Sequence, residues 1–409
     1  MATRASAQIG VAEIERAAET IRGRVRETPV VSAGEISRRA GGTVRLKAEN
    51  LQRTGSFKVR GAQNRIAALD DDELAAGVVA ASAGNHAQAV AVAAGSRGTN
   101  AVLYMPEDAP IAKIEAVRGY GGEVRLVPGS FDDAGAAARE ACEREGLTLI
   151  HAFDDPVVLA GQGTIGLEIA RQAPETRLVV VAVGGGALIA GTAIAIKDRL
   201  PGARVVGVQS DACAPYPPSL EAHRPIGARS ASTICDGIAI KRPGELTLPL
   251  VSEYVDQVVT VSDDDVAEAM VLLLERSKLV VEGAGAASVA ALLSGNVEPP
   301  ADGEVCAVLS GGNVDAARLV ECIRLGETAA GRRLVFSTVV PDRPGALAGL
   351  VATVAEAGAN VLDVVHIREG VDLHVRETGI RLVLQTDGPG HGERIIAAVR
   401  EQGFTLTAG

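Results

Sequence analysis

Short apolar runs alternate with segments of helical period through the first three quarters of the chain. The runs read TVRLKAE, GVVAAS, NAVLYM, EVRLV, LVVVAV, ARVVGVQ and EVCAVLS, at residues 43–49, 77–82, 100–105, 123–127, 178–183, 203–209 and 304–310. The segments between them are rich in Ala, Leu and Glu and have the spacing of amphipathic helices. Strands that alternate with helices form parallel sheets with crossover helices, so the pattern predicts an α/β fold.

The pattern changes at the polar segment GETAAGRR, residues 326–333. Beyond it, LVFSTVVPD predicts a strand, RPGALAGLVATVAEAG a helix, NVLDVVHIRE and LHVRETGIRLVLQTD two strands, and GERIIAAVREQG a helix. This order is typical of a small ferredoxin-like α+β unit, which is too small to be an enzyme core. We therefore expect a large domain at residues 1–328, with a smaller lobe near 45–150, and a separate domain at 332–409.

Composition narrows the class of protein. The 409 residues are 47% hydrophobic and 22% charged, which is ordinary for globular domains. A net charge of −11 and a pI near 5.2 argue against a nucleic-acid partner, because phosphate backbones require a basic face. No apolar run is long enough to span a membrane, and the first residues lack the apolar core of a signal peptide. We expect a cytoplasmic protein with no membrane partner.

The cysteines and histidines predict no metal site. The five cysteines contain no CxxC pair, so we expect neither a disulfide framework nor zinc, and we interpret them as reduced core residues. His86, in GNHAQ, is a candidate for a ligand site. The other histidines lack metal spacing and fit surface or core positions.

The strongest local signal is the glycine loop in VVVAVGGGALIAG, where an apolar strand meets Gly184, Gly185 and Gly186 and then a helix. Backbone N–H groups in such a loop turn toward one point, and the helix adds its positive end. We interpret the loop as a phosphate site, although a tight turn without a ligand also fits. The loop matches neither GxxxxGK[ST] nor GxGxxG, and the next strand ends in Gln209 instead of an acid.

Lysine is scarce in this chain, since only six of the 40 basic residues are lysines. An arginine cannot lose its proton or form an imine, so any imine chemistry falls to a lysine. Lys58, in SFKVRG, is the best placed. Ser56 is a suitable N-cap for the helix FKVRGAQNRIAAL, and the Lys58 amine would project from its first turn. Taken alone, an exposed lysine at a helix start explains the stretch equally well.

Six motifs occur in a fixed order: KAENLQRTGSFKVRGA, ASAGNHAQAVA, VGGGALIAG, DGIAIK, VEGAGAASVAAL and LSGGNVD. Together they resemble the threonine dehydratase family of pyridoxal-phosphate enzymes, which has the tryptophan-synthase-β type of fold. The resemblance spans about residues 10–325. It implies a two-lobed catalytic domain, pyridoxal 5′-phosphate as cofactor and a small amino acid as substrate.

The resemblance also implies roles for residues that match the motifs. Lys58 would form the imine with the cofactor aldehyde and then remove the substrate α-proton. Asn85 would hydrogen-bond the phenolic oxygen of the cofactor, and Ser310 would face its pyridine nitrogen. The implied cofactor-binding residues are Lys58, Phe57, Asn85, Gly184, Gly185, Gly186, Ala187, Leu188 and Ser310. The implied substrate-binding residues are Ser82, Ala83, Gly84, Asn85 and His86.

The implied reaction is the α,β-elimination of L-threonine to 2-oxobutanoate and ammonia, catalysed by a carbon–nitrogen lyase. A serine at position 310 cannot give the ring a full proton, so the ring is a weaker electron sink, which suits elimination better than transamination. One methyl group is worth about 1–3 kcal/mol in a pocket, so we expect slower action on L-serine. Isoleucine biosynthesis and threonine catabolism both use this chemistry.

Two positions depart from the family pattern. The fourth glycine of the phosphate loop is Ala187, which keeps its N–H but adds a methyl group. Serine racemases of this family carry a serine before Gly-Asn-His, where this chain has Ala83. Those relatives also bind a divalent ion, for which this chain offers Asp211 alone, a poor site. We expect no racemase activity and no metal.

The C-terminal domain resembles an ACT domain, a small regulatory module that binds amino acids where two copies meet. The resemblance is carried by VVPDRPGALAGL and implies an effector site at Asp342, Pro344, Gly345 and Asn360. We expect allosteric control by a hydrophobic amino acid such as isoleucine or valine, and a homodimer or homotetramer. A Pro-Gly turn before a helix also has an ordinary structural explanation.

Other functions remain open at this point. A nucleotide-binding oxidoreductase would explain the glycine loop but not the lysine motif. A serine dehydratase, an enzyme similar to serine racemase, and an amino-acid sensor with a catalytically weak domain all fit parts of the pattern. A cysteine synthase shares the fold, but it has a different asparagine loop and no ACT domain.

Overall fold

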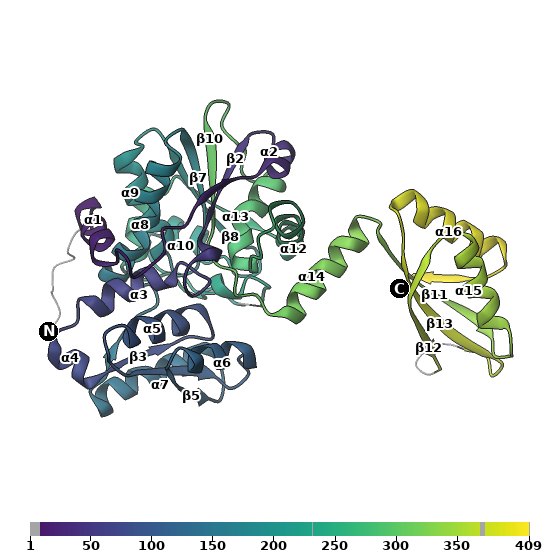
Figure 1. Ribbon diagram of the computed structural model, residues 1–409, viewed down its shortest axis with the longest axis horizontal. Coiled ribbons are helices and arrows are strands. Elements are labelled where there is room, and N and C mark those ends of the chain that lie inside the picture. The colour runs from purple at the N-terminus through teal and green to yellow at the C-terminus, as the bar shows by residue number, and fades with distance from the viewer. Residues whose placement is uncertain (1–8, 231, 369–372, 409) are drawn as a thin grey trace. The chain divides into compact units, whose positions relative to one another are not determined.

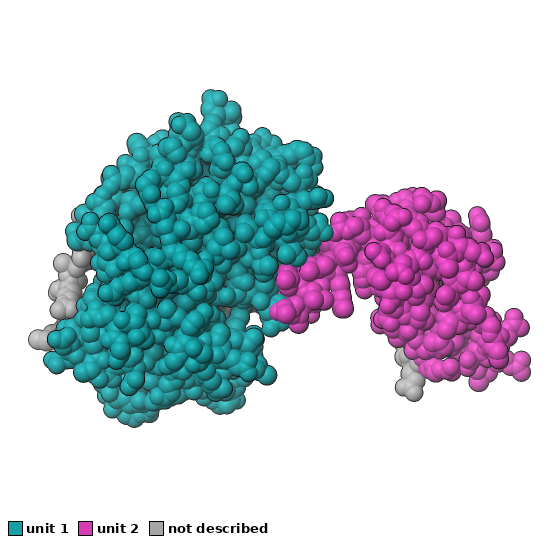
Figure 2. Space-filling view, viewed as in Figure 1, with its two compact units in different colours: residues 1–315 teal, residues 316–409 magenta. Residues whose placement is uncertain are grey.

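The computed structural model describes residues 9–230, 232–368 and 373–408. The chain forms two compact units, Met1–Asp315 and Ala316–Gly409 (Figure 2). Each unit has its own sheets, helices and hydrophobic core (Figure 1).

The larger lobe of the first unit is built on a six-stranded sheet with the order β1-β2-β10-β7-β8-β9. Its strands are β1 (Val30–Ser32), β2 (Thr43–Ala48), β7 (Thr176–Ala182), β8 (Arg204–Ser210), β9 (Gln257–Val261) and β10 (Glu304–Leu309). The β1 strand pairs antiparallel with β2, and the other neighbours pair parallel. Parallel strands are covered on both faces, so they are continuously apolar in sequence, as β7 and β8 are.

The smaller lobe holds a second, fully parallel sheet with the order β5-β4-β3-β6. Its strands are β3 (Val78–Ala81), β4 (Ala101–Pro106), β5 (Glu123–Val127) and β6 (Thr148–Leu149). One face packs against α3 (Lys58–Ala67), α5 (Asn85–Gly95) and α6 (Ile111–Gly119), and the other against α7 (Phe131–Glu145). Helices thus cover both faces of this sheet, as an α/β layer requires.

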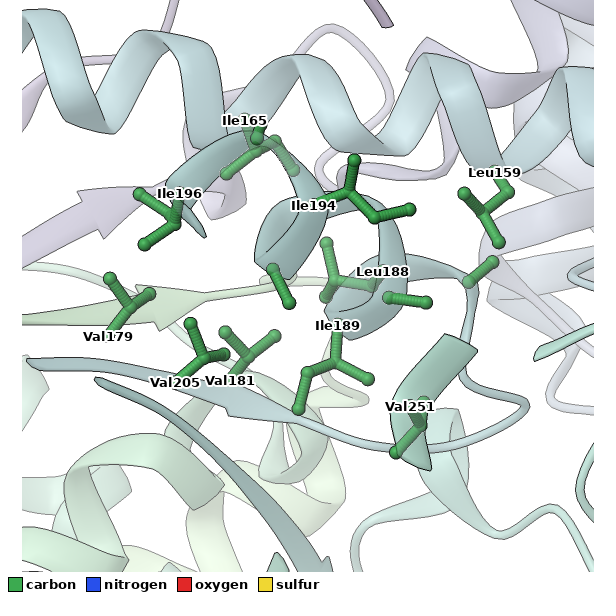
Figure 3. Close-up of a cluster of buried hydrophobic side chains, with 14 of the residues drawn as sticks. Leu159, Ile165, Val179, Val181, Leu188, Ile189, Ile194, Ile196, Val205 and Val251 are labelled. Atoms are coloured by element: carbon green, nitrogen blue, oxygen red, sulfur yellow. The ribbon is translucent and has the colours of Figure 1, made fainter. Parts of the chain in front are cut away.

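The core of the larger lobe forms where α8 (Pro156–Gln172) and α9 (Ala187–Arg199) pack with β7 and β8 (Figure 3). A Cβ atom at Gly163 of α8 would come within 2.9 Å of the Gly191 carbonyl of α9, so glycine permits the close approach of these helices. The further helices of this unit are α1 (Val11–Thr20), α2 (Gly34–Ala40), α4 (Asp71–Ala76), α8 (Pro156–Gln172), α9 (Ala187–Arg199), α10 (Tyr216–Ala222), α11 (Thr247–Tyr254), α12 (Asp263–Leu272) and α13 (Gly283–Leu293). Short turns of 3₁₀ or π type are η1 (Glu49–Leu51), η2 (Asp236–Ile238) and η3 (Leu273–Ser277).

The second unit is a four-stranded antiparallel sheet with the order β12-β13-β11-β14 and a core formed with two helices. Its elements are α14 (Ala316–Ala329), β11 (Arg333–Pro341), α15 (Ala346–Glu356), β12 (Asn360–Ile367), β13 (Glu377–Gln385), α16 (Pro389–Glu401) and β14 (Leu406–Ala408). From β11 onward, the βαββαβ order and this strand order are those of the ferredoxin-like arrangement.

The predicted α/β fold is confirmed, and every strand predicted from an apolar run in the first unit is present. The predictions missed β1, β6, β9 and β14. The first residues of the polar segment 326–333 complete α14, and its last residue begins β11. In the described part of the chain, no helix has the length and apolar character needed to cross a membrane.

Candidate active site

A cavity of about 820 Å³ receives residues from both lobes of the first unit. This volume is in the usual range for small-molecule sites. All of the predicted cofactor and substrate residues line it: Phe57, Lys58, Ser82, Ala83, Gly84, Asn85, His86, Gly184, Gly185, Gly186, Ala187, Leu188 and Ser310. Segments more than 200 residues apart in the chain therefore meet at one site.

Lys58 enters the cavity from the first turn of α3. Its amine donates a hydrogen bond to the Ala152 carbonyl at 3.0 Å and lies 5.2 Å from the centre of the Phe57 ring. Burial lowers the pKa of Lys58 to about 8, although the negative charge of Glu282 opposes this effect. An amine with this pKa is partly neutral near pH 7 to 8, so it can act as a nucleophile and a base.

Ser56 does not cap this helix as the sequence predicted. The N-cap position is Phe57, and no side chain there bonds to the helix. Ser56 instead forms a backbone bridge with Gly311, and its buried hydroxyl has no hydrogen-bond partner among the described residues. The Phe57 N–H donates to the Ser310 carbonyl at 3.1 Å. The start of α3 is therefore positioned by the chain around residues 310–311, not by a serine cap.

The glycine loop lies at the N-terminus of α9, and the packing behind it explains its composition. A Cβ at Gly185 would come within 2.1 Å of the Phe153 ring, and one at Gly186 within 1.9 Å of the Tyr216 hydroxyl. Gly186 also has a φ of 99°, a left-handed conformation that favours glycine. Side chains therefore cannot replace these glycines without displacing the wall of the cavity.

Ala187 at the fourth loop position is 3% exposed and belongs to the large-lobe core. The Gly185 carbonyl accepts hydrogen bonds from the Tyr216 and Thr247 hydroxyls, at 3.2 and 2.6 Å. These side chains hold the loop from behind. Sequence analysis missed both, because neither lies in a motif.

The Ser82–Asn85 turn places a second group of donors, the N–H groups of Ala83 and Asn85, at the N-terminus of α5. The Gly84 N–H donates to the Ser82 hydroxyl at 3.1 Å, which shapes the turn. Asn85 begins the helix, and its side chain donates to Glu282 and accepts from Asn313, both at 2.7 Å. A helix N-terminus with its free N–H groups suits a carboxylate.

Lys113 adds positive charge beside this turn. A Cβ at Gly84 would lie 3.5 Å from the Lys113 Nζ. The same amine forms an ion pair at 2.5 Å with Asp236, so it connects α6 of the smaller lobe to η2 of the larger lobe. The sequence analysis gave neither residue a role, since Lys113 is one of six lysines and Asp236 lies within the DGIAIK motif.

Two histidines line the cavity and remain neutral. His86 Nε2 lies 2.8 Å from the Ile150 carbonyl, so this nitrogen carries the proton. Burial, together with the charge of Lys58, lowers the pKa of His86 to about 3. His151, which the sequence assigned to surface or core, accepts the Asp154 N–H at 2.8 Å and thereby orders the turn that holds Ala152. Its pKa is also lowered by burial.

The residues present fit pyridoxal phosphate. A lysine amine, a glycine loop at a helix N-terminus and an asparagine amide line one cavity, and Ser310 adds a buried hydroxyl. These groups match the aldehyde, the phosphate, the phenolic oxygen and the ring nitrogen of that molecule. Among the described residues, no cluster of His, Cys, Asp or Glu is suited to a metal ion.

The comparisons with known proteins agree with this chemistry. A family model for pyridoxal-phosphate dependent enzymes matches residues 21–311, and the chain belongs to this family. An L-threonine ammonia-lyase of Thermotoga maritima is 44% identical over 97% of this chain and 99% of its own length.

Solved structures are similar to about three quarters of the chain. The threonine deaminase of T.th. is 40% identical with a TM-score of 0.71, over 75% of this chain and 99% of that chain. Maize serine racemase is 36% identical with a TM-score of 0.73, over 76% of this chain and 96% of that chain. The fold is thus shared by enzymes with different products.

The predicted effector residues lie in the second unit. Asp342, Pro344 and Gly345 occupy the loop between β11 and α15, and Asn360 begins β12. Asp342 pairs with Arg368 at 3.1 Å, and Gly345 is the N-cap of α15 with a φ of 90°. The Asn360 amide donates to Gln385 across the sheet at 3.2 Å.

Proposed function

We propose that this protein catalyses the pyridoxal-phosphate-dependent α,β-elimination of L-threonine to 2-oxobutanoate and ammonia. The observation that carries the proposal is the cavity in which the Lys58 amine and the Gly184–Gly186 loop meet. Similarity over 97% of the chain to an L-threonine ammonia-lyase supports the choice of reaction.

Pyridoxal phosphate, when bound, supplies an aldehyde that takes up an amine and a conjugated ring that withdraws electrons from the α-carbon. Lys58 would be the nucleophile that holds this aldehyde, and with a substrate amine in its place the same Nζ would accept the α-proton. Its lowered pKa leaves enough neutral amine for both tasks.

Other residues of the chain bind and orient. The N–H groups of Gly184–Leu188 would hold a phosphate at the α9 N-terminus, and those of Ala83 and Asn85 would hold the substrate carboxylate, with Lys113 nearby. Ser310 offers a hydroxyl to the ring nitrogen, and a hydroxyl does not transfer a full proton there. Neutral His86 and His151 add no positive charge to the cavity.

An assay of the purified protein tests this function. We expect 2-oxo acid and ammonia from L-threonine, and a loss of at least about 10³-fold in kcat for Lys58→Ala, because the nucleophile and base are one group. Lys241→Ala is the matched control, since Lys241 lines the same cavity but is half exposed. Turnover that survives in Lys58→Ala would contradict the proposal.

We also propose that L-serine is a poorer substrate and that racemisation is negligible. Loss of the β-methyl group lowers kcat/KM by about 10–200-fold. Ala83 offers no proton to the face of the α-carbon opposite Lys58. Formation of D-serine from L-serine at a rate near that of elimination would refute this part of the proposal.

For the second unit we propose an ACT-type regulatory role, in which a hydrophobic amino acid such as isoleucine or valine binds near Asp342, Pro344, Gly345 and Asn360. The ferredoxin-like topology supports this role. Such sites form between copies, so the proposal includes a homodimer or homotetramer.

A further inference from the structure

Glu282 is a buried carboxylate to which sequence analysis gave no role. It precedes α13, lines the cavity and is 4% exposed. Its Oε1 accepts a hydrogen bond from Asn85 Nδ2 at 2.7 Å, while no basic side chain of the described residues lies within ion-pair distance of it. A buried carboxylate without a cation destabilises a fold, so packing alone does not account for it.

The hydrogen bonds around Asn85 determine which way its amide points. The Thr54 carbonyl can only accept, so the Asn313 atom at 2.7 Å from it is the donor Nδ2. That same Nδ2 lies 2.7 Å from Asn85, so the Asn85 atom facing it is Oδ1. The Asn85 nitrogen is then the atom that faces Glu282.

This arrangement leaves Asn85 able only to donate a hydrogen bond toward the cavity that it lines. Its oxygen is occupied by Asn313, and one of its amide hydrogens is directed to Glu282. The other amide hydrogen remains for a ligand, which must present an acceptor. Without Glu282 and Asn313, the Asn85 amide could rotate by half a turn and present its oxygen to the cavity instead.

The charges near Glu282 come from three other elements. Asp236 of η2, Lys113 of α6 and Lys58 of α3 all act on it, and Asp236 is itself paired with Lys113. Burial, followed by the charge of Asp236, raises the pKa of Glu282 to about 7. The carboxylate also lies against Gly311, where a Cβ would come within 2.2 Å of Oε1.

We propose that Glu282 is a positioning residue which, together with Asn313, fixes the Asn85 amide as a hydrogen-bond donor to the phenolic oxygen of pyridoxal phosphate. The proposal rests on the proposed function, because it assumes that cofactor. In this role Glu282 acts through Asn85, to which it is hydrogen-bonded.

The test compares Glu282→Leu with Glu282→Gln in the full chain. Leucine removes the acceptor, while glutamine keeps an acceptor of the same shape and loses the charge. The Glu282 side chain makes no capping bond to α13, so neither change removes a helix cap. The measurement is the Kd of pyridoxal phosphate, from titration of the cofactor-stripped protein by absorbance, with the visible spectrum of the loaded protein as a second readout.

We expect Glu282→Leu to weaken cofactor binding by about tenfold or more and to change the visible spectrum, as for a lost hydrogen bond to a charged group. Glu282→Gln should recover a substantial part of this loss, because a neutral acceptor keeps the hydrogen bond at about half the strength of a charged one. Glu245→Leu is the control, because Glu245 lines the same cavity but its side chain bonds to Arg242. It should leave the Kd unchanged.

Equal Kd values for Glu282→Leu and the natural protein would overturn the inference. The inference would also be overturned if Glu282→Gln bound pyridoxal phosphate as weakly as Glu282→Leu. Orientation of the Asn85 amide by a hydrogen-bond acceptor would then not be the cause of the loss. If circular dichroism shows that Glu282→Leu does not fold, Asn313→Leu replaces it in the test. We expect this variant to weaken cofactor binding by the same factor, and an unchanged Kd would overturn the inference. Failure of the natural protein to bind pyridoxal phosphate would instead contradict the proposed function.

Discussion

Burial makes the Lys58 amine reactive, but it also destabilises the folded protein. The folded protein lowers its pKa from 10.5 to about 8, mainly by burial. At pH 7 the amine is therefore charged in a site that disfavours charge. The same desolvation that makes the amine reactive destabilises the folded state.

Replacing this amine should therefore stabilise the cofactor-free protein. We expect Lys58→Met to raise the free energy of unfolding by about 1–3 kcal/mol at pH 7, since the side chain is partly exposed. Above pH 8 the folded amine loses its proton while the unfolded one keeps it up to 10.5, so the natural protein gains stability there. Urea denaturation at pH 7 and pH 10 measures the difference, which should shrink at the higher pH. A gap that is the same at both values would contradict this account.

At the scale of the element, α3 carries the reactive lysine and is held by a buried ionic cluster. Arg60, two residues after Lys58, is fully buried and bonds to Glu49 at 2.8 Å and to Glu168 of α8 at 2.6 Å. Lys47 of β2 completes the cluster at Glu168. Burial alone would raise the pKa of Glu49, but the charge of Arg60 acts against burial, and this pKa is lowered. The cluster therefore fixes α3 against α8 and η1.

Breaking this ionic cluster should strongly destabilise the folded protein. We expect Arg60→Met to lower the free energy of unfolding by about 3–5 kcal/mol, because Glu49 is left buried without its cation. Arg45→Met is the matched control, since Arg45 pairs with Glu304 in a more exposed place and should cost about 1 kcal/mol or less. Thermal or urea unfolding of the two variants checks this expectation. Similar losses in both would show that burial of the cluster is not what matters.

The elements that sequence reasoning found are those whose pattern is local. Buried parallel strands such as β7 and β10 are continuous apolar runs, which composition alone reveals. The strands it missed are short, as β1, β6 and β14 are, or only partly buried, as β9 is, so their pattern is weak. The prediction of Ser56 as a helix cap failed because the chain near Gly311 positions that turn instead.

The candidate site likewise contains residues that the sequence indicates and contacts that it does not. Lys58, the glycine loop, Asn85 and Ser310 lie in motifs, and the structure brings them to one cavity. Their roles remain proposals. Glu282 and Asn313 lie in motifs that were also noticed, VEGAG and LSGGN, but their hydrogen bonds to Asn85 join residues about 200 positions apart. Tertiary contacts of this kind have no local pattern, so a single sequence does not reveal them.

At the scale of the whole molecule, the chain combines a unit that holds the cavity with a unit whose described residues do not contribute to it. The threonine deaminase structure of T.th. matches 75% of this chain while 99% of that chain is covered. That chain is therefore shorter than this one by about the length of the second unit. The first unit of this chain, which has its own core, should fold alone.

Deleting residues from 332 onward therefore separates catalysis from regulation. We expect the shortened chain to turn over L-threonine within about a factor of two of the full chain, because the cavity and its core stay intact. We expect its response to isoleucine or valine to vanish, because coupling requires the effector site. Initial rates at increasing effector concentration, for both chains at equal cofactor loading, measure the two properties together. Inhibition that is unchanged after the deletion would place the effector site in the first unit and refute the regulatory role proposed for the second.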